Sequence, residues 1–411
     1  MKKLKYLAVC LMAVGMLAGC GSVETNNGSP IVDVVGEEIN TPAPDAGTGT
    51  GGSTGSDAGT TESGTEPTAT PEAEVDKAES STIEEREVVD GMMQSYLTGE
   101  WLPEEVAKRR PMAVMIGNNI GLMPQWGISK ASIIYEAPVE GRISRLMAII
   151  EDYDELEMVG PVRSSRDYFV YEAMAYDAIY CNWGLAIPYV EELLKSDRID
   201  NVSQALKGIH NPSPEAFFRR DRPGYSTEYT GYMSISGYTK AVGNRGYSAT
   251  YRNTFEQAFT FANDGWVSEY SEYPDATVIY PGGNSSNKSG YGDHKPRFEY
   301  NAEDGLYYRY QFGAAHIDEL NGEQLTVTNV VFKICHGEQR DTNDYLAFGV
   351  HGEGDAYIFT NGKVIEATWS RSSDSGANMF FDKDGNEIVL NQGKTWICCI
   401  WEEYENYMMW E

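Results

Sequence analysis

Two kinds of hydrophobic pattern follow one another along this chain. From residue 96 to about residue 265, short apolar runs are bounded by Gly, Pro and Asn, which is typical of mostly buried strands. These runs lie at residues 111–119, 131–140, 145–153 and 178–183. The pattern therefore predicts four strands in this part of the chain.

Helical patterns alternate with these strands. Residues 164–178 place apolar side chains at spacings of three and four, which predicts a helix. Pro188 opens a second helical segment, the Ser-Pro-Glu at residues 213–215 opens a third, and Gly243 closes a fourth. Strands that alternate with helices indicate an α/β layered domain, which we place at residues 94–265.

After about residue 266 the pattern changes to short alternating runs. Asp-Gly and Asn-Gly pairs separate these runs, and such pairs supply the positive φ angles of tight hairpin turns. The pairs begin at residues 304, 321, 361 and 384. We therefore expect a smaller antiparallel β domain at residues 266–411, which makes the predicted fold class α+β.

The first twenty residues have the pattern of an export signal. Three lysines precede an apolar run from Leu7 to Ala18, and this run is shorter than the roughly 20 residues that a membrane-spanning helix needs. It ends in Leu-Ala-Gly followed by Cys20, which resembles a bacterial lipoprotein signal. We predict a signal peptide at residues 1–19 and acylation of Cys20. The mature chain would then be held on membrane lipid outside the cytoplasm.

Residues 20–93 have the composition of a disordered tether. They are rich in Gly, Ser, Thr, Pro and acidic residues, and no aromatic residue occurs between Cys20 and Tyr96. Residues 21–100 hold 17 Asp and Glu against two basic residues, which gives half of the chain's net charge of −30. Because the remainder of the chain is acidic as well, its charge does not suit a nucleic-acid partner.

The candidate site begins at the predicted junction of a strand and a helix. Ser164, with Asp167 three residues later, has the spacing of a helix-capping box. Capping does not explain Arg163 and Arg166, which belong with Ser164 and Ser165 to the candidate ligand site. Arginines beside the free amides of a helix N-terminus favour an anion.

Other predicted strand ends add Glu136, Glu140 and Arg145 to this candidate site. Three interpretations remain open. The arginines and glutamates form a buried network that fixes the loops, or they bind a carboxylate, phosphate or sugar. In the third, Glu136 and Glu140 act as an acid and base on a glycosidic bond.

Other residue patterns point less clearly to chemistry. His316 and Asp318 are two residues apart and face the same side of a strand, and both residue types bind zinc. No second such pair occurs in the sequence, so we expect neither a metal nor another cofactor. Cys335 either forms a disulfide with Cys398 or Cys399 or is a buried thiol like a small apolar residue.

Five stretches resemble the YerB-type family of bacterial lipoproteins. They are YLTGEWLPEEVAKRRPMAVMIGNN, MPQWGISKASIIYEAPVEGRISRLMAI, MVGPVRSSR, NGKVIEATWSR and LNQGKTWICCIW. The chain departs from the family pattern at residues 141–145, where Gly-Arg-Ile-Ser-Arg replaces Gly-Gly before Ile-Thr-Arg. It also lacks a Pro-His-Asn segment near residue 224. The resemblance implies a domain of unknown function, then a smaller C-terminal domain, with no established catalytic residue.

Together these patterns predict a lipid-anchored binding or accessory protein of the bacterial cell envelope. Its expected partners are membrane lipid, through Cys20, and cell-wall glycan, peptide or an envelope protein. One alternative is an envelope glycan hydrolase that uses Glu136 and Glu140. Another is a scaffold whose C-terminal domain docks a membrane enzyme.

Overall fold

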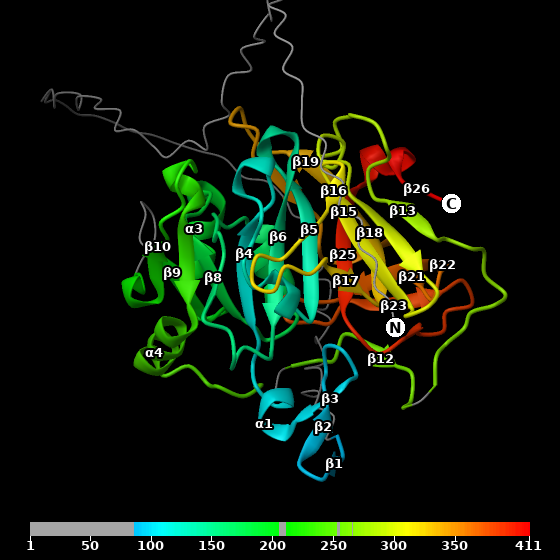
Figure 1. Cartoon of the computed structure of the whole chain (residues 1–411), viewed down its shortest axis with the longest axis horizontal. Helices are drawn as coiled ribbons and strands as arrows, with labels where there is room; N and C mark the ends of the chain where they lie inside the picture. The colour runs from blue at the N-terminus through cyan, green and yellow to red at the C-terminus, as the bar shows by residue number, and fades with distance from the viewer. Residues whose placement is uncertain (1–85, 205–210, 253–254, 265) are drawn as a thin grey trace, which may run out of the picture. The chain divides into compact units, whose positions relative to one another are not determined.

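The computed structural model describes residues 86–204, 211–252, 255–264 and 266–411 (Figure 1). The predicted signal peptide, Cys20 and most of the predicted tether lie outside these residues. The described chain is rich in strands and has few helices.

A mixed ten-stranded sheet runs through the described chain (Figure 1). In spatial order its strands are β23 (Met379–Asp382), β22 (Lys363–Arg371), β21 (Gly352–Thr360), β18 (Asn329–Cys335), β25 (Thr395–Trp401), β5 (Ile133–Val139), β6 (Ile143–Ile150), β4 (Met112–Gly117), β8 (Ile179–Trp183) and β9 (Asn201–Gln204). Strands β4, β5, β18 and β25 are buried along most of their length, which explains their continuous apolar runs.

The C-terminal strands differ from the predicted antiparallel sheet. β25 pairs in parallel with β18 and also in parallel with β5. Strands from both parts of the chain therefore belong to one sheet. Local sequence did not indicate this pairing, because the partners of β25 are far away along the chain. The domain boundary between residues 265 and 266 stays a prediction.

Two helices pack on one face of the sheet. They are α2 (Asp167–Met174) and α3 (Ile187–Lys195). Phe169 and Val190 of these helices join Tyr135 and Met147 of the strands in one hydrophobic core. The predicted helix at residues 164–178 is thus confirmed, although it begins at Asp167.

A second sheet and another helix cover the opposite face. The second sheet consists of β16 (Ala314–Ala315), β15 (Leu306–Gln311), β14 (Arg297–Asn301), β13 (Val278–Tyr280) and β26 (Met409–Trp410), with β17 (Thr326–Val327) paired to β15. The helix is α4 (Ile235–Arg245), which begins at the side-chain cap Ser234. Phe298 and Tyr238 join Ile134 and Trp396 in the core on this face.

Shorter elements complete the described chain. The remaining strands are β1 (Val88–Val89), β2 (Met92–Gln94), β3 (Trp101–Pro103), β7 (Met158–Val159), β10 (Phe217–Arg219), β11 (Gly231–Ser234), β12 (Thr260–Phe261), β19 (Gly337–Gln339), β20 (Leu346–Phe348) and β24 (Val389–Leu390). The remaining helices are α1 (Glu104–Ala107) and the short 3-10 helices η1 (Ile120–Leu122), η2 (Ile128–Lys130), η3 (Glu140–Arg142), η4 (Pro214–Ala216), η5 (Thr227–Tyr229) and η6 (Glu402–Tyr407).

Two local predictions were wrong. The helix expected after residues 213–215 is a single 3-10 turn followed by β10, because β10 pairs with β11 and Phe217 packs edge-on against Trp183 at 5.7 Å. Tertiary pairing overrides local helix propensity here. Ser164 does not cap α2 either, since the N-cap position belongs to Arg166 and no side chain caps the helix.

Candidate functional site

Seven strands of the ten-stranded sheet end at one edge. β4, β5, β8, β9, β18, β22 and β25 run in the same direction, and ligands of open α/β sheets bind outside the carboxyl ends of such strands. The Arg163 amide donates to the Met115 carbonyl at 3.0 Å, and the Trp183 amide donates to the Arg163 carbonyl at 3.1 Å. Arg163 therefore connects the ends of β4 and β8. We call residues 118–122, 140–145, 163–166, 183, 219 and 227–230 the strand-end edge.

Most of the predicted site residues meet at this edge. Arg166 holds Glu140, donating from Nε to Oε1 at 2.9 Å and to Oε2 at 3.1 Å. The Arg145 Nη1 donates to the Ser164 carbonyl at 2.8 Å, and the Ser165 hydroxyl lies 2.7 Å from the Tyr180 hydroxyl. These contacts agree with the interpretation of a polar network that fixes the loops. They also keep a charged pair at the end of β5, where Glu140 is partly exposed.

Arg163 lies in a second polar group at the same edge. Its guanidinium donates to the Glu228 carbonyl at 2.9 Å and to Glu228 Oε2 at 3.1 Å, and it lies 5.5 Å from the ring centre of Tyr229. Only 7% of Arg163 is exposed, whereas 37% of the Glu228 side chain is exposed. Arg163 therefore adds positive charge beneath a surface formed by η5.

Sequence reasoning missed Arg219, which lies beside this group. The Arg219 guanidinium stacks 4.3 Å from the ring centre of Trp183, and the residue is exposed. Its Nη1 donates to the Thr227 carbonyl and, at 3.5 Å, to the Thr230 hydroxyl. Partial burial and the nearby charge of Arg163 lower the pKa of Arg219. Residues 217–219 were predicted to be helical, and a helix there would not have placed Arg219 near Trp183.

An apolar side chain adjoins these arginines. Ile120 is 69% exposed, the largest exposed fraction among the large hydrophobic residues of the described chain. Its neighbour Gly121 lies against the Tyr229 ring, so a Cβ there would be 2.9 Å from a ring carbon. Asn119 Nδ2 donates to the Tyr229 hydroxyl at 3.3 Å. The strand-end edge thus combines several arginines with the partly exposed Glu140, which is paired with Arg166, and with the exposed apolar side chain of Ile120.

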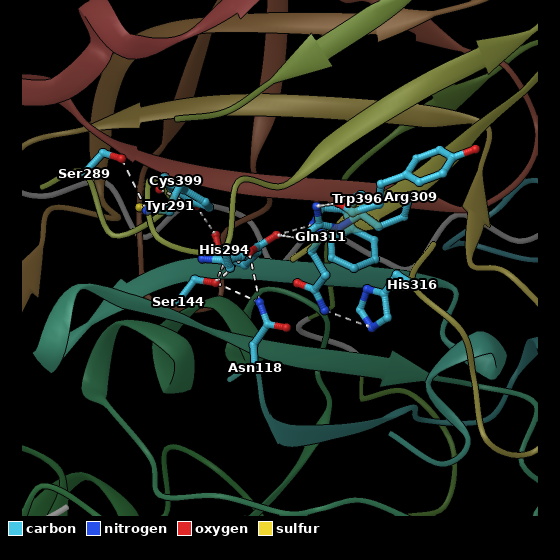
Figure 2. A network of polar contacts seen from close by, with 12 residues as sticks. Asn118, Ser144, Ser289, Tyr291, His294, Arg309, Gln311, His316, Trp396 and Cys399 are labelled. Carbon is cyan, nitrogen blue, oxygen red and sulfur yellow. Dashed lines mark hydrogen bonds and ion pairs between the residues drawn. The ribbon is translucent and has the colours of Figure 1, made fainter. Parts of the chain in front are cut away.

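Glu136 lies elsewhere, buried between the ten-stranded sheet and the second sheet. It is 0% exposed. Five side chains donate hydrogen bonds to its carboxylate, and Figure 2 shows these donors converging from both sheets. Oε1 accepts from Asn118 at 3.2 Å, Ser144 at 2.6 Å and His294 at 3.0 Å, and Oε2 accepts from Arg309 at 2.7 Å and Trp396 at 3.0 Å. The carboxylate therefore joins β4, β5, β6 and β25 to β15.

This environment determines the charge of Glu136. Burial by itself raises the pKa of the carboxyl, but the Arg309 charge and the hydrogen bonds from His294 and Ser144 lower it to about 2. A carboxyl with this pKa stays ionised, whereas the general acid of a glycosidase needs a raised pKa. Glu136 and Glu140 lie in different environments, so the predicted acid and base pair is not assembled.

The predicted pair of His316 and Asp318 is also separated. His316 Nε2 donates to Gln125 Oε1 at 2.7 Å, and burial lowers the pKa of His316 well below its ordinary value. The Asp318 carboxylate accepts from the backbone amides of Gly127 at 2.9 Å and Ser129 at 2.7 Å, so it fixes a turn. Within the described ranges, no three His, Cys, Asp or Glu residues form a group that would hold a metal ion.

The described cysteines are buried thiols. Cys181, Cys335, Cys398 and Cys399 are all free and buried. Burial raises the pKa of Cys181 and Cys398 well above the usual range, which makes both thiols poor nucleophiles. This observation favours the second of the two alternatives for Cys335, a buried thiol.

The described residues include no helix with the length and apolar character that a membrane crossing requires. The predicted lipid anchor at Cys20 and the signal peptide lie outside those residues, so they stay predictions.

Comparison with known proteins first identifies the protein family. Residues 97–248 match the N-terminal domain of a protein of unknown function, DUF3048, and residues 288–397 match the C-terminal domain of the same family. The chain therefore belongs to the DUF3048 family, which confirms the resemblance seen in the sequence.

A particular relative follows from the same comparison. The chain is 29% identical over 308 residues to the "Putative lipoprotein YerB" of Bacillus subtilis (strain 168), covering 74% of this chain and 85% of the relative. The crystal structure of YerB protein from Bacillus subtilis has the same fold, with a TM-score of 0.64 and 24% identity over 77% of this chain and 98% of that one. Homology to YerB suggests a lipoprotein of unknown function.

Proposed function

We propose that this chain is a lipid-anchored extracytoplasmic binding protein of the bacterial cell envelope, and that the strand-end edge is its recognition surface. The anchor would be Cys20, with residues 20–93 as a tether that lifts the binding domain away from the lipid headgroups. The lipoprotein-type sequence before Cys20 and the name of the YerB relative support this location.

One observation carries the proposed recognition surface. Four arginines, Arg145, Arg163, Arg166 and Arg219, gather at one edge of the sheet in a chain whose net charge is −30. A local group of guanidinium groups in an acidic protein favours an anionic partner, because electrostatic complementarity selects the partner and orients it. Ile120 adds an exposed apolar contact beside them.

Co-sedimentation with isolated cell-wall material tests this function. The full-length protein in detergent is mixed with washed cell walls, and the bound fraction is measured after centrifugation. We expect wild-type protein to sediment with the walls and Ile120→Glu to bind less, because its negative charge opposes an anionic partner. Val267→Glu is the matched control, since Val267 is 53% exposed. Its neighbour Ser268 donates its amide to Asn391, which lies four residues before β25 and therefore toward the opposite end of the sheet.

The outcomes separate the three functions predicted from the sequence. If wild-type protein does not sediment with cell walls or extracted envelope polymer, the binding function is refuted. If Ile120→Glu binds like wild type, the recognition surface lies elsewhere. Release of soluble sugar fragments supports the hydrolase instead, and loss of a crosslinked membrane enzyme on deletion of residues 266–411 supports the scaffold.

The anchor has its own test. Cells that express the full chain are fed a labelled fatty acid, and the protein is then recovered from the membrane fraction. We expect wild-type protein to carry the label and Cys20→Ala to carry none, because the predicted acylation site is the Cys20 thiol. Recovery of unlabelled wild-type protein from the cytoplasm, with residues 1–19 still attached, would refute the proposed location.

A further inference from the structure

Two of the three guanidinium nitrogens of Arg219, Nε and Nη2, have no hydrogen-bond partner in the described part of the chain. An arginine carries five N–H donors in a fixed fork. The described contacts of Arg219, to Thr227 and Thr230, both use Nη1. Neither Nε nor Nη2, the pair that binds an oxyanion in bidentate fashion, has a partner among the residues of the described ranges. Arg219 also forms no ion pair with any described carboxylate.

The surroundings of Arg219 hold this fork in place. One face of the guanidinium lies against Trp183, with 4.3 Å between the Arg219 carbon and the ring centre. The ring is fixed in turn, because Gly231 packs so closely that a Cβ there would be 2.7 Å from a carbon of Trp183. A preorganised guanidinium loses less conformational entropy when it binds than a mobile surface arginine does.

The nearby charges favour an anion at this position. Arg163 lies beneath the same surface, and its charge contributes to the lowered pKa of Arg219. Glu228 supplies one negative charge, and it is bonded to Arg163 at 3.1 Å. Glu228 is thus engaged by Arg163, while the charge of Arg219 has no paired carboxylate among the described residues and lies next to exposed N–H donors. An oxyanion at Arg219 would offset the repulsion between the two arginines.

We propose that Arg219, stacked on Trp183 beside Arg163, is an oxyanion-binding residue, and that the ligand of the strand-end edge is an anionic polymer whose phosphate or carboxylate groups dock there. This inference rests on the proposed function and adds the chemical class of the ligand. Arg219 contacts the oxyanion, Trp183 positions the guanidinium, and Arg163 supplies charge from below. Ile120 contacts the uncharged part of the same polymer.

Binding of defined polymers tests this inference. Dissociation constants of the full-length protein are measured for inorganic polyphosphate, for polygalacturonate and for neutral dextran. The first two probes distinguish phosphate from carboxylate as the source of the oxyanion. We expect at least one polyanion to bind, with affinity that falls as salt increases, and dextran to bind at least tenfold more weakly.

Variants of Arg219 identify the contact. Arg219→Ala should weaken polyanion binding by about tenfold to a hundredfold, because a charge-assisted bidentate contact is lost. Arg219→Lys should recover only part of the affinity, since lysine keeps the charge but lacks the fork. Arg198→Ala is the matched control and should bind like wild type, since Arg198 is also exposed and lies 5.6 Å from the Tyr171 ring centre, but pairs with Asp374.

The results distinguish this inference from the proposed function. Suppose that the protein binds cell walls but has the same affinity for dextran as for the polyanions, or that Arg219→Ala does not change polyanion binding. The oxyanion site is then refuted and the binding function stands. If the polyanions bind through Arg219 but cell walls do not bind, the site stands and the envelope function is refuted. If neither binds, both are refuted.

Discussion

The buried carboxyl of Glu151 has no cationic partner among the described residues, and this arrangement makes folding stability depend on pH. It follows β6 directly and is 1% exposed. The Ser95 hydroxyl lies 2.7 Å from Oε1 and 2.8 Å from Oε2, and the Ser132 hydroxyl lies 2.7 Å from Oε1. Burial, with additional contributions from the charges of Glu100 and Asp152, raises the pKa of Glu151 to about 7 against the opposing effect of these two hydroxyls.

The magnitude follows from the two pKa values. A carboxyl whose pKa rises from 4.5 in the unfolded chain to about 7 in the folded protein binds its proton more tightly when folded, by about 3 kcal/mol. Because the folded pKa is the higher one, this stabilisation is fully present below about pH 4.5. It is lost as the pH rises through about 7, where folding must accommodate a buried negative charge.

The perturbation is Glu151→Gln, which keeps the side-chain shape and removes the titration. Free energies of unfolding are measured by urea denaturation between pH 5 and pH 8. We expect the stability of wild type relative to Glu151→Gln to fall by about 2 to 3 kcal/mol over this range, because most of the titration lies within it. Glu155→Gln is the control, since Glu155 is an exposed glutamate four residues away. A stability difference between wild type and Glu151→Gln that does not change with pH would contradict this reasoning.

Three other substitutions should change the stability, and a labelling experiment tests the reactivity of the cysteines. Glu136→Gln should lower the free energy of unfolding by about 3 to 5 kcal/mol, because the buried Arg309 loses its counter-charge, and a loss below about 1 kcal/mol in urea denaturation would speak against the network. Gly237→Ala should destabilise α4 by about 1 to 3 kcal/mol, since the new Cβ would be 2.2 Å from the Glu215 carbonyl oxygen. Gly243→Ala in the same helix meets nothing within 4 Å and should stabilise by up to about 1 kcal/mol, so equal thermal shifts for the two variants would refute the packing argument. The four buried cysteines of the described chain should resist an alkylating reagent in native buffer and react fully in urea, which mass spectrometry measures, and fast native labelling would contradict their burial.

Local sequence was sufficient for elements whose pattern repeats within a few residues. The apolar runs at 111–119, 131–140 and 145–153 became β4, β5 and β6, and the spacing of three and four after residue 164 became α2. The pairing of β25 with β5 joins residues more than 250 positions apart, as in Cys398 opposite Glu136. No local pattern specifies such a partner, so the shared sheet was not predicted.

The candidate site was predicted in part for the same reason. Arg166 and Glu140 were recognised because each follows a strand-like run. Glu136 belongs to the same run as Glu140 but lies within β5, which is buried along its whole length, and its partner Arg309 comes from β15. Arg309 lies on the same side of β15 as Tyr307 and Gln311, and all three residues are buried. A charged residue on the inward side of a predicted strand was therefore the signal for the Glu136 network.

The place of β25 in the sheet has a consequence for the order of folding. This strand, Thr395–Trp401, fills the gap between β5 and β18. Until residues 395–401 have been synthesised, both neighbours present open hydrogen-bonding edges that invite aggregation. The growing polypeptide therefore cannot complete its ten-stranded sheet before that point. A product truncated before residue 395 would lack the strand that joins the two halves of the sheet, and we expect it to misfold rather than to form a smaller working protein.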